Sequence, residues 1–219
     1  MTARPSELRD LWPLYALRLT TGELELRYPT EAELPAFVDI IEDGIHPPEE
    51  MPFGVAWSVM PSPAFERGFV QHHWGVRASW TPEAWTLNLL VELDGRPIGT
   101  QTLAATEFAI HRAVDTGSWL GMAFQGRGYG KEMRSAVLSL AFDGLGARSA
   151  ESSAFLDNLA SSGVSRALGY SDNGRGSLAP QGVARETQRF RLTVDDWRSR
   201  PRPRVEIDGL EACRELFGA

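Results

Sequence analysis

The chain has 219 residues, a formal net charge of −7 and a sequence pI near 5.2. Hydrophobic residues make up 42% of it and charged residues 23%, values typical of a soluble globular protein, and no apolar run approaches the roughly 20 residues of a membrane helix. These values argue against a nucleic-acid partner, because phosphate binding needs a basic surface, and against a membrane partner.

Cysteine and histidine usage indicates the compartment and excludes a metal site. Cys213 is the single cysteine, so no intramolecular disulfide forms, and residues 1–10 lack the apolar core of a signal peptide. We therefore expect a cytoplasmic protein. His72 and His73 are adjacent and point apart, and no His-x-x-x-His or cysteine cluster accompanies them, so we expect no metal.

The first elements along the chain are a strand and a helix. Residues 24–28 alternate apolar and polar side chains, which predicts a strand. Thr30 and Glu33 have the spacing of a capping box, which predicts a helix through about residue 42. Residues 44–63 contain five prolines, so we expect a long loop there.

The middle of the chain predicts a helix and a hairpin. Residues 64–79 have a helical pattern. Two apolar runs, 85–93 and 97–105, flank Asp94-Gly95, a dipeptide that favours a type I′ hairpin turn. A further sheet segment is expected over residues 116–124.

The last third of the chain predicts alternating helices and strands. The expected helices cover about residues 129–141 and 158–168, and the expected strands cover 149–155 and 190–194. A small strand and helix are expected over 205–218. This order predicts an α/β protein with a mixed sheet of about six or seven strands, helices on both faces, and a parallel strand pair flanking a crossover helix at 127–143.

A glycine-rich turn, Gln125-Gly126-Arg127-Gly128-Tyr129-Gly130, lies between a predicted strand and a predicted helix. Glycine lets the backbone approach a ligand closely, and the first N–H groups of a helix lack intrahelical partners. The helix dipole favours an anion at the same place, and Arg127 and Lys131 can add charge-assisted contacts. The turn therefore predicts a pyrophosphate site.

Two other nucleotide motifs fit this turn poorly. A dinucleotide fingerprint needs a third glycine where Lys131 stands. A P-loop needs Ser or Thr after its Gly-Lys pair, and here Glu132 follows Lys131. The sequence is also compatible with a tight strand-to-helix turn that binds no ligand.

The glycine turn and five further segments, in chain order, resemble the GNAT acyltransferase superfamily, and its RimJ/RimL branch in particular. The turn is similar to the family's Q/R-x-x-G-x-G/A pyrophosphate loop. The other similar segments are Leu24 to Arg27, Gly117 to Leu120, Ala141-Phe142, Asn158 to Ser161 and Leu168 to Tyr170. The resemblance covers about residues 23–194, and the whole chain also resembles an actinobacterial GNAT group associated with succinyl-CoA.

This resemblance implies a GNAT fold with a splayed parallel strand pair. It implies a single acyltransferase domain over 1–219, with a core at 23–194 and an extension at 195–219 that could complete a homodimer. The implied activity is direct transfer of an acetyl or succinyl group from acyl-CoA to a primary amine in a ternary complex. A GNAT domain that binds acyl-CoA as a sensor or scaffold without turnover is the alternative.

The resemblance also assigns a CoA site. Met122 to Phe124 would offer backbone groups to the pantetheine, Gln125 to Lys131 would bind the pyrophosphate, and Asn158 and Ser161 would border the thioester slot. The full set is Met122, Ala123, Phe124, Gln125, Gly126, Arg127, Gly128, Tyr129, Gly130, Lys131, Asn158 and Ser161.

The candidate catalytic groups follow from the chemistry of thioester aminolysis, which needs a base and an oxyanion donor and benefits from protonation of the leaving thiolate. Many family members place a Tyr seven residues after the Asn, where this chain has Ser165, so Ser161 or Ser165 could donate to the sulfur instead. Asp115 is the candidate base, and a backbone N–H near Met122 is the candidate oxyanion donor.

The acceptor amine is not determined by the sequence. Trp57, in the proline-rich loop with Met51 and Phe53, is the best candidate for an acceptor-pocket wall or a dimer contact. A succinyl donor would need a cation for its carboxylate, for which Arg77, Arg112 and Arg127 are available.

Overall fold

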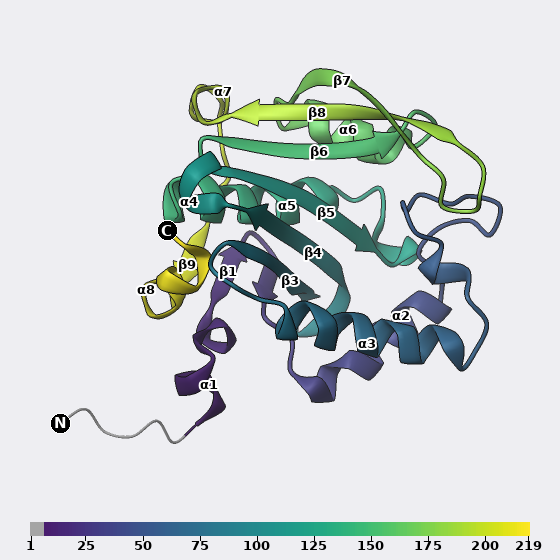
Figure 1. The fold of residues 1–219 in the computed structure, drawn as a ribbon, viewed down its shortest axis with the longest axis horizontal. Helices are drawn as coiled ribbons and strands as arrows, with labels where there is room; N and C mark the ends of the chain where they lie inside the picture. Colours follow the sequence, from purple (N-terminus) through teal and green to yellow (C-terminus); the bar gives the residue numbers. More distant parts are fainter. Residues whose placement is uncertain (1–6) are drawn as a thin grey trace.

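A computed structural model describes residues 7–219, which form a nine-stranded sheet in the order β7-β8-β6-β5-β4-β3-β2-β1-β9 (Figure 1). The strands are β1 (Arg18–Thr21), β2 (Leu24–Arg27), β3 (Ala84–Leu93), β4 (Arg96–Thr106), β5 (Ala113–Leu120), β6 (Ser149–Phe155), β7 (Ser171–Leu178), β8 (Arg185–Thr193) and β9 (Glu206–Asp208). All neighbouring strands are antiparallel except β5 and β6.

The α-helices are α1 (Leu8–Leu11), α2 (Leu34–Glu42), α3 (Ala64–Ala78), α4 (Phe108–His111), α5 (Tyr129–Ser139), α6 (Leu159–Ala167), α7 (Val194–Arg198) and α8 (Leu210–Cys213). The 3₁₀ turns are η1 (Pro13–Ala16), η2 (Glu31–Glu33), η3 (Trp57–Val59), η4 (Met122–Phe124) and η6 (Arg214–Phe217), and α5 continues into a π turn, η5 (Leu140–Gly144). None of the helices described is long and apolar enough to cross a membrane.

Two predictions made from short sequence motifs are confirmed, the capping box at Thr30 and the hairpin turn at Asp94-Gly95. The Thr30 hydroxyl and backbone N–H both donate to the Glu33 carboxylate at 2.7 Å, which closes the predicted capping box. Asp94 and Gly95 join β3 to β4 with φ of 51° and 72°, as a type I′ turn requires.

The prediction of six or seven strands was too low. β7 escaped detection because it is a polar, solvent-exposed edge strand without apolar alternation. β1 lies before the expected first strand and pairs with β2, and the short β9 extends the sheet by pairing with β1. The expected segment 116–124 was also too long, because β5 ends at Leu120 and the tight turn η4 follows.

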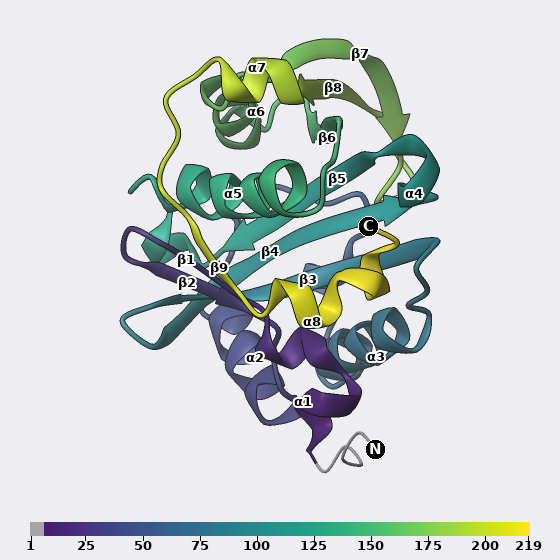
Figure 2. The same ribbon diagram turned by 90° about the vertical axis from the view of Figure 1, so that its left-hand side faces the viewer.

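Helices cover both faces of the sheet, as predicted. Figure 2 shows α5 on one face and α2 and α3 on the other. The larger core packs α5 against the sheet through side chains such as Val114, Leu120 and Val137. A second cluster packs α2 and α3 on the opposite face, with Phe37 and Phe69 at its centre.

The parallel strands β5 and β6 diverge, which confirms the expected splay. They pair only from Ala113–Ser149 to Asp115–Glu151. Beyond that point β5 continues beside β4 alone, while β6 continues beside β8. An opening therefore forms between the carboxyl-terminal halves of the two strands.

The C-terminal extension packs against the chain's own sheet (Figure 2). Phe217 is fully buried, and its ring makes edge contacts with Trp80 and Trp85. The indole N–H of Trp80 donates to the Leu216 carbonyl at 2.8 Å, and that of Trp85 donates to the Phe217 carbonyl at 3.1 Å. These contacts fix the extension to the amino-terminal end of β3.

We predict that Phe217→Ala lowers the free energy of unfolding by about 3–5 kcal/mol, because it leaves a cavity among two tryptophans. Val183→Ala, at a side chain that is 67% exposed, is the matched control and should change stability little. Urea denaturation followed by tryptophan fluorescence measures both. Similar, small losses in the two variants would show that the extension is not part of the stable core.

Candidate active site

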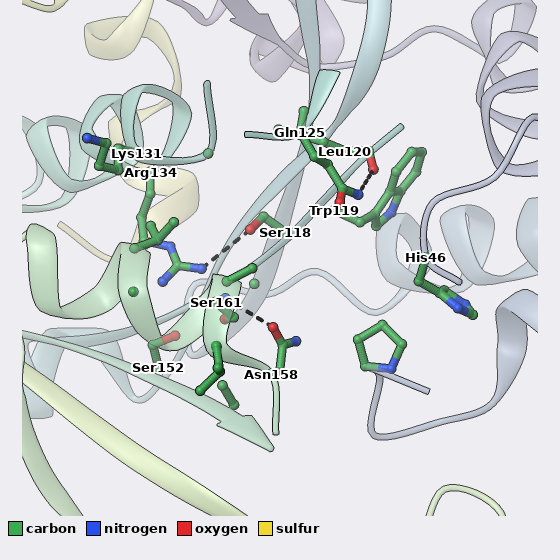
Figure 3. A pocket seen from close by; sticks show the side chains of 18 of the residues that line it. His46, Ser118, Trp119, Leu120, Gln125, Lys131, Arg134, Ser152, Asn158 and Ser161 are labelled. Atoms are coloured by element: carbon green, nitrogen blue, oxygen red, sulfur yellow. Dashed lines mark hydrogen bonds between the residues drawn. The ribbon is translucent and has the colours of Figure 1, made fainter. Parts of the chain in front are cut away.

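The opening between β5 and β6 leads into a cleft of about 710 Å³ (Figure 3). Its walls come from the second half of β5, the start of α5, the start of α6 and the loop around His46. Seven of the sequence-predicted residues line it together: Gln125, Gly126, Gly128, Gly130, Lys131, Asn158 and Ser161. The sequence thus located most of one continuous site.

The glycine turn has the geometry of an anion cradle. Gly126 and Gly128 have φ of 73° and 95°, in the region that favours glycine. A Cβ built on either would meet no atom within 4 Å, so the space above the turn is open. The backbone N–H groups of 126–128 donate no hydrogen bond within the described chain, and α5 begins at the next residue. Unpaired N–H groups beside a helix start favour an anion, and Gly126 and Gly128 line the cleft.

Gln125 has a role that the sequence did not reveal. Its side-chain amide donates to the Leu120 carbonyl at 2.8 Å and to the Ile45 carbonyl at 2.9 Å. Its backbone N–H donates to the Met122 carbonyl. The side chain therefore ties the loop at one wall of the cleft to the end of β5.

Five of the residues predicted to bind CoA do not line the cleft: Met122, Ala123, Phe124, Arg127 and Tyr129. The Met122 N–H, expected near the oxyanion, donates to the Gly44 carbonyl at 2.9 Å, and the Phe124 N–H donates to the Gly121 carbonyl. Both N–H groups are therefore already bonded within the chain, one to the loop after α2 and one within the tight turn η4. Their contacts with pantetheine stay predictions.

Asn158 and Ser161 lie together at the start of α6 (Figure 3). The Asn158 side-chain oxygen accepts the Ser161 N–H at 3.0 Å and so caps the helix. Both side chains line the cleft, where they border the opening between the strands.

Ser165, by contrast, lies outside the cleft lining and is fully buried. Its hydroxyl accepts a hydrogen bond from Arg134 Nη1 at 2.9 Å and donates to the Ser161 carbonyl at 3.3 Å. Arg134 itself does line the cleft. No pattern in the sequence pointed to it, because a lone arginine in an amphipathic helix is ordinarily placed on the solvent face.

Asp115 is placed on β5 beside Glu151 of β6 and lines neither the cleft nor the second cavity described below. Partial removal from water, reinforced by Glu151, raises the pKa of its carboxyl. Its role as base stays a prediction.

A second cavity of about 500 Å³ lies on the opposite face of the sheet, between α3, the proline-rich loop and β3 to β5. Five aromatic side chains dominate its lining: Phe53, Trp57, Phe65, Phe69 and Trp119. It shares Gly117, Ser118 and Trp119 with the cleft, so the two spaces meet where β5 leaves β6. Trp57 was the one wall residue that the sequence suggested.

Polar groups form one side of this second cavity. The Thr102 hydroxyl donates to the Asn88 side-chain oxygen at 2.7 Å, and the Asn88 amide faces His72 Nε2 at 3.5 Å. Burial lowers the pKa of His72. Burial, reinforced by His72 and Arg77, lowers the pKa of His73 to about 4. Both histidines are therefore uncharged at neutral pH.

No group of three or more His, Cys, Asp or Glu side chains that could hold a metal occurs within residues 7–219.

Comparison with known families agrees with this geometry. Residues 23–171 match the family described as "Acetyltransferase (GNAT) domain". The match spans more than half of the chain, and the protein belongs to this family of acetyltransferases.

Solved structures share the fold at low sequence identity. RimJ of Mycobacterium smegmatis, in complex with CoA-disulfide, aligns with a TM-score of 0.65 and 18% identity over 90% of this chain and 91% of that chain. RimL, an alpha-N-protein acetyltransferase of a ribosomal protein, solved in complex with coenzyme A, gives 0.65 and 17% over 82% and 99%. A GNAT-family acetyltransferase from Bacillus anthracis gives 0.63 and 13% over 81% and 99%.

We predict that Gly126→Glu abolishes measurable CoA binding, because a carboxylate would project into the space of the pyrophosphate. Gly95→Glu is the matched control, since Gly95 has nearly the same φ, 72° against 73°, and its built Cβ is also free of contacts. Both variants should lose about 1–2 kcal/mol of stability from backbone strain.

Isothermal titration calorimetry with CoA measures the difference between these variants. Equal CoA affinities in the two would mean that the turn does not bind the nucleotide.

Proposed function

We propose that this protein transfers an acetyl group from acetyl-CoA to a primary amine by direct attack in a ternary complex. One observation carries the proposal: two cavities on opposite faces of the sheet meet at Gly117–Trp119, where β5 and β6 separate. A donor bound in the cleft would present its thioester at this junction, and an acceptor in the second cavity would reach it from the other face. The CoA complexes of RimL and RimJ support a CoA donor.

The lining of the second cavity favours acetyl over succinyl. A succinyl carboxylate needs a cation or several N–H donors, and the described lining contains no Lys or Arg. Arg77 is paired with Glu31, and Arg112 donates to the Leu145 carbonyl over the Phe108 ring. Neither side chain lines this cavity, and Arg127 does not line it either.

The same lining favours an acceptor amine carried on an apolar or aromatic body. Aromatic rings can pack against such a body and also attract its ammonium group before it loses a proton. Among the described lining residues there is no Asp or Glu that would compensate several positive charges. Polyamines and aminoglycosides therefore fit this cavity poorly.

The reaction needs a group to take the proton of the attacking amine. His72 and His73 line the second cavity. His73 is buried and packed between the rings of Phe37 and Phe69, which leaves His72 as the accessible base. The amine nitrogen forms a bond to the thioester carbon, the carbon–sulfur bond breaks, and the amine proton passes to His72. Alignment of the two reactants across the junction contributes most of the rate.

Binding of acyl-CoA without turnover is the second candidate function. The burial of Ser165 favours it, because one of the two hydroxyls expected to donate a hydrogen bond to the sulfur lies outside the cleft.

The test is a thermal-shift series with CoA, acetyl-CoA, succinyl-CoA and NAD, followed by a thiol-release assay with an amine panel. We expect CoA compounds alone to raise Tm. We further expect thiol release with acetyl-CoA and an arylalkylamine, and little with spermidine. A Tm shift without thiol release on any amine would identify a binding protein, and no shift at millimolar CoA would overturn both functions.

We predict that Gly68→Phe raises KM for the acceptor by roughly tenfold or more while CoA affinity is unchanged. Gly68 lines the second cavity from α3, and a built Cβ there meets nothing within 4 Å, so the ring would fill the acceptor space without a clash. Gly75→Phe, on the same helix with the same freedom but outside the cavity, is the control and should keep the wild-type KM. Steady-state kinetics compares them, and equal KM values would place the acceptor elsewhere.

A further inference from the structure

Arg134 is a buried cation at the inner end of the cleft. It is 3% exposed and lines the cleft from α5. Its Nη1 donates to the Ser165 hydroxyl at 2.9 Å. Its Nη2 reaches the Ser118 hydroxyl at 3.4 Å (Figure 3). Its buried Nε has no hydrogen-bond partner. Several of its five N–H groups are therefore unused.

The charge of Arg134 has no counter-ion within residues 7–219. No Asp or Glu oxygen lies within 4.0 Å of its nitrogens, although other arginines in the chain form such pairs, for example Arg27 with Glu92. The Tyr170 hydroxyl is the titratable neighbour that acts on it. A buried, unpaired guanidinium is costly, and proteins ordinarily pair such a group. Its presence indicates that an anion arrives there from outside the chain.

The side of the sheet on which Arg134 lies indicates where that anion forms. Side chains alternate along β5, so Thr116, Ser118 and Leu120 face α5, whereas Gly117 and Trp119 face the second cavity. Arg134 reaches Ser118 on the α5 face, which is also the face of the glycine turn. The cation therefore lies on the donor side of the opening, at the sulfur end of the cleft.

We propose that Arg134 stabilises the CoA thiolate as it leaves, an inference that rests on the proposed acyl transfer. When the amine nitrogen bonds to the carbonyl carbon, the carbon–sulfur electron pair stays on sulfur as a thiolate. Arg134 offers this charge fixed N–H donors in a site shielded from water, where such an interaction is strong. Arginine remains protonated, so it acts by charge and hydrogen bonding, and the thiolate takes its proton from water after release.

Two other anions fit the position less well. A carboxylate on the acyl group would extend through the opening into the second cavity, on the other face of the sheet. The pyrophosphate would lie at the glycine turn, where Lys131 and the free N–H groups are. Arg134 follows Lys131 by almost one helical turn and points inward to Ser118 and Ser165.

The titratable groups around this position are few. Tyr170 lies behind Thr116, and burial raises the pKa of its hydroxyl. Lys131 lies at the mouth of the cleft, and His46 lies on the facing loop, bonded to Pro47 and Ser58. Asp115 and Glu151 belong to the opposite face of the sheet by strand alternation.

The decisive experiment is CoA affinity as a function of pH, measured by calorimetry between about pH 7 and about pH 9.5, which brackets the ordinary thiol pKa of about 8.5. Wild-type protein should bind CoA roughly tenfold more tightly at the upper end, because Arg134 favours the thiolate form. Desulfo-CoA, which has no thiol, should show no such gain. In Arg134→Met the gain with CoA should disappear.

Lys131→Met is the matched control, since it removes a cation of the same helix at the other end of the cleft. It should weaken CoA and desulfo-CoA alike at every pH and leave the gain with pH intact. Arg134→Lys, which keeps the charge, should retain part of the gain and serves if the methionine variant does not fold.

Turnover and stability give independent readouts. Arg134→Met should lower kcat with acetyl-CoA by roughly 100-fold with little change in KM, because the charge appears only during the reaction. The unliganded variant should have a Tm at least equal to that of wild type, because an unpaired buried charge is replaced by an apolar side chain.

Three results would overturn the inference. The first is a CoA affinity that is equally pH-dependent in wild type and Arg134→Met. The second is a selective loss of succinyl-CoA affinity in the variant, which would identify an acyl carboxylate as the anion. The third is a strongly lowered Tm, with CoA binding and kcat unchanged in Arg134→Lys, which would indicate a structural role. Absence of CoA binding in the wild type would instead contradict the proposed function itself.

Discussion

The separation of β5 from β6 is the constraint on which the rest of the site depends. The two parallel strands pair over three residues and then part, so the sheet is open at its centre. Because backbone and side chains on both faces become accessible there, a cleft on the α5 face and a cavity on the α2–α3 face share the residues Gly117–Trp119. A closed sheet would separate the two spaces, whereas this opening connects them.

The elements around the opening are held by contacts that are distant in sequence. Gln125 fastens the loop at Ile45 to the end of β5, and Asn158 fixes the start of α6 on the other side. Arg134 bridges α5, α6 and β5 through Ser165 and Ser118. The α5 side of the opening is thus polar and cationic, while the α2–α3 side is aromatic and uncharged.

The family, the sheet class and most of the cradle could be predicted from the sequence. The capping box at Thr30, the Asp94-Gly95 turn and the glycine turn were recognised because each depends on the backbone preferences of a few neighbouring residues. The edge strand β7 was missed because its side chains are solvated on both faces and carry no hydrophobic period. The short β9 was expected as a strand, but its pairing with β1 was not predicted, because that pairing joins segments from the two ends of the chain.

The sequence by itself therefore determined the fold family and the glycine turn that opens α5, since both depend on local patterns. Only the tertiary structure decided which polar groups meet. It buried Ser165 beneath the cleft, gave Arg134 a place at the opening without a counter-ion among residues 7–219, and assembled an aromatic cavity from α3, a loop and three strands. Burial and charge pairing are properties of segments far apart in the chain, and a pattern of neighbouring residues does not contain them.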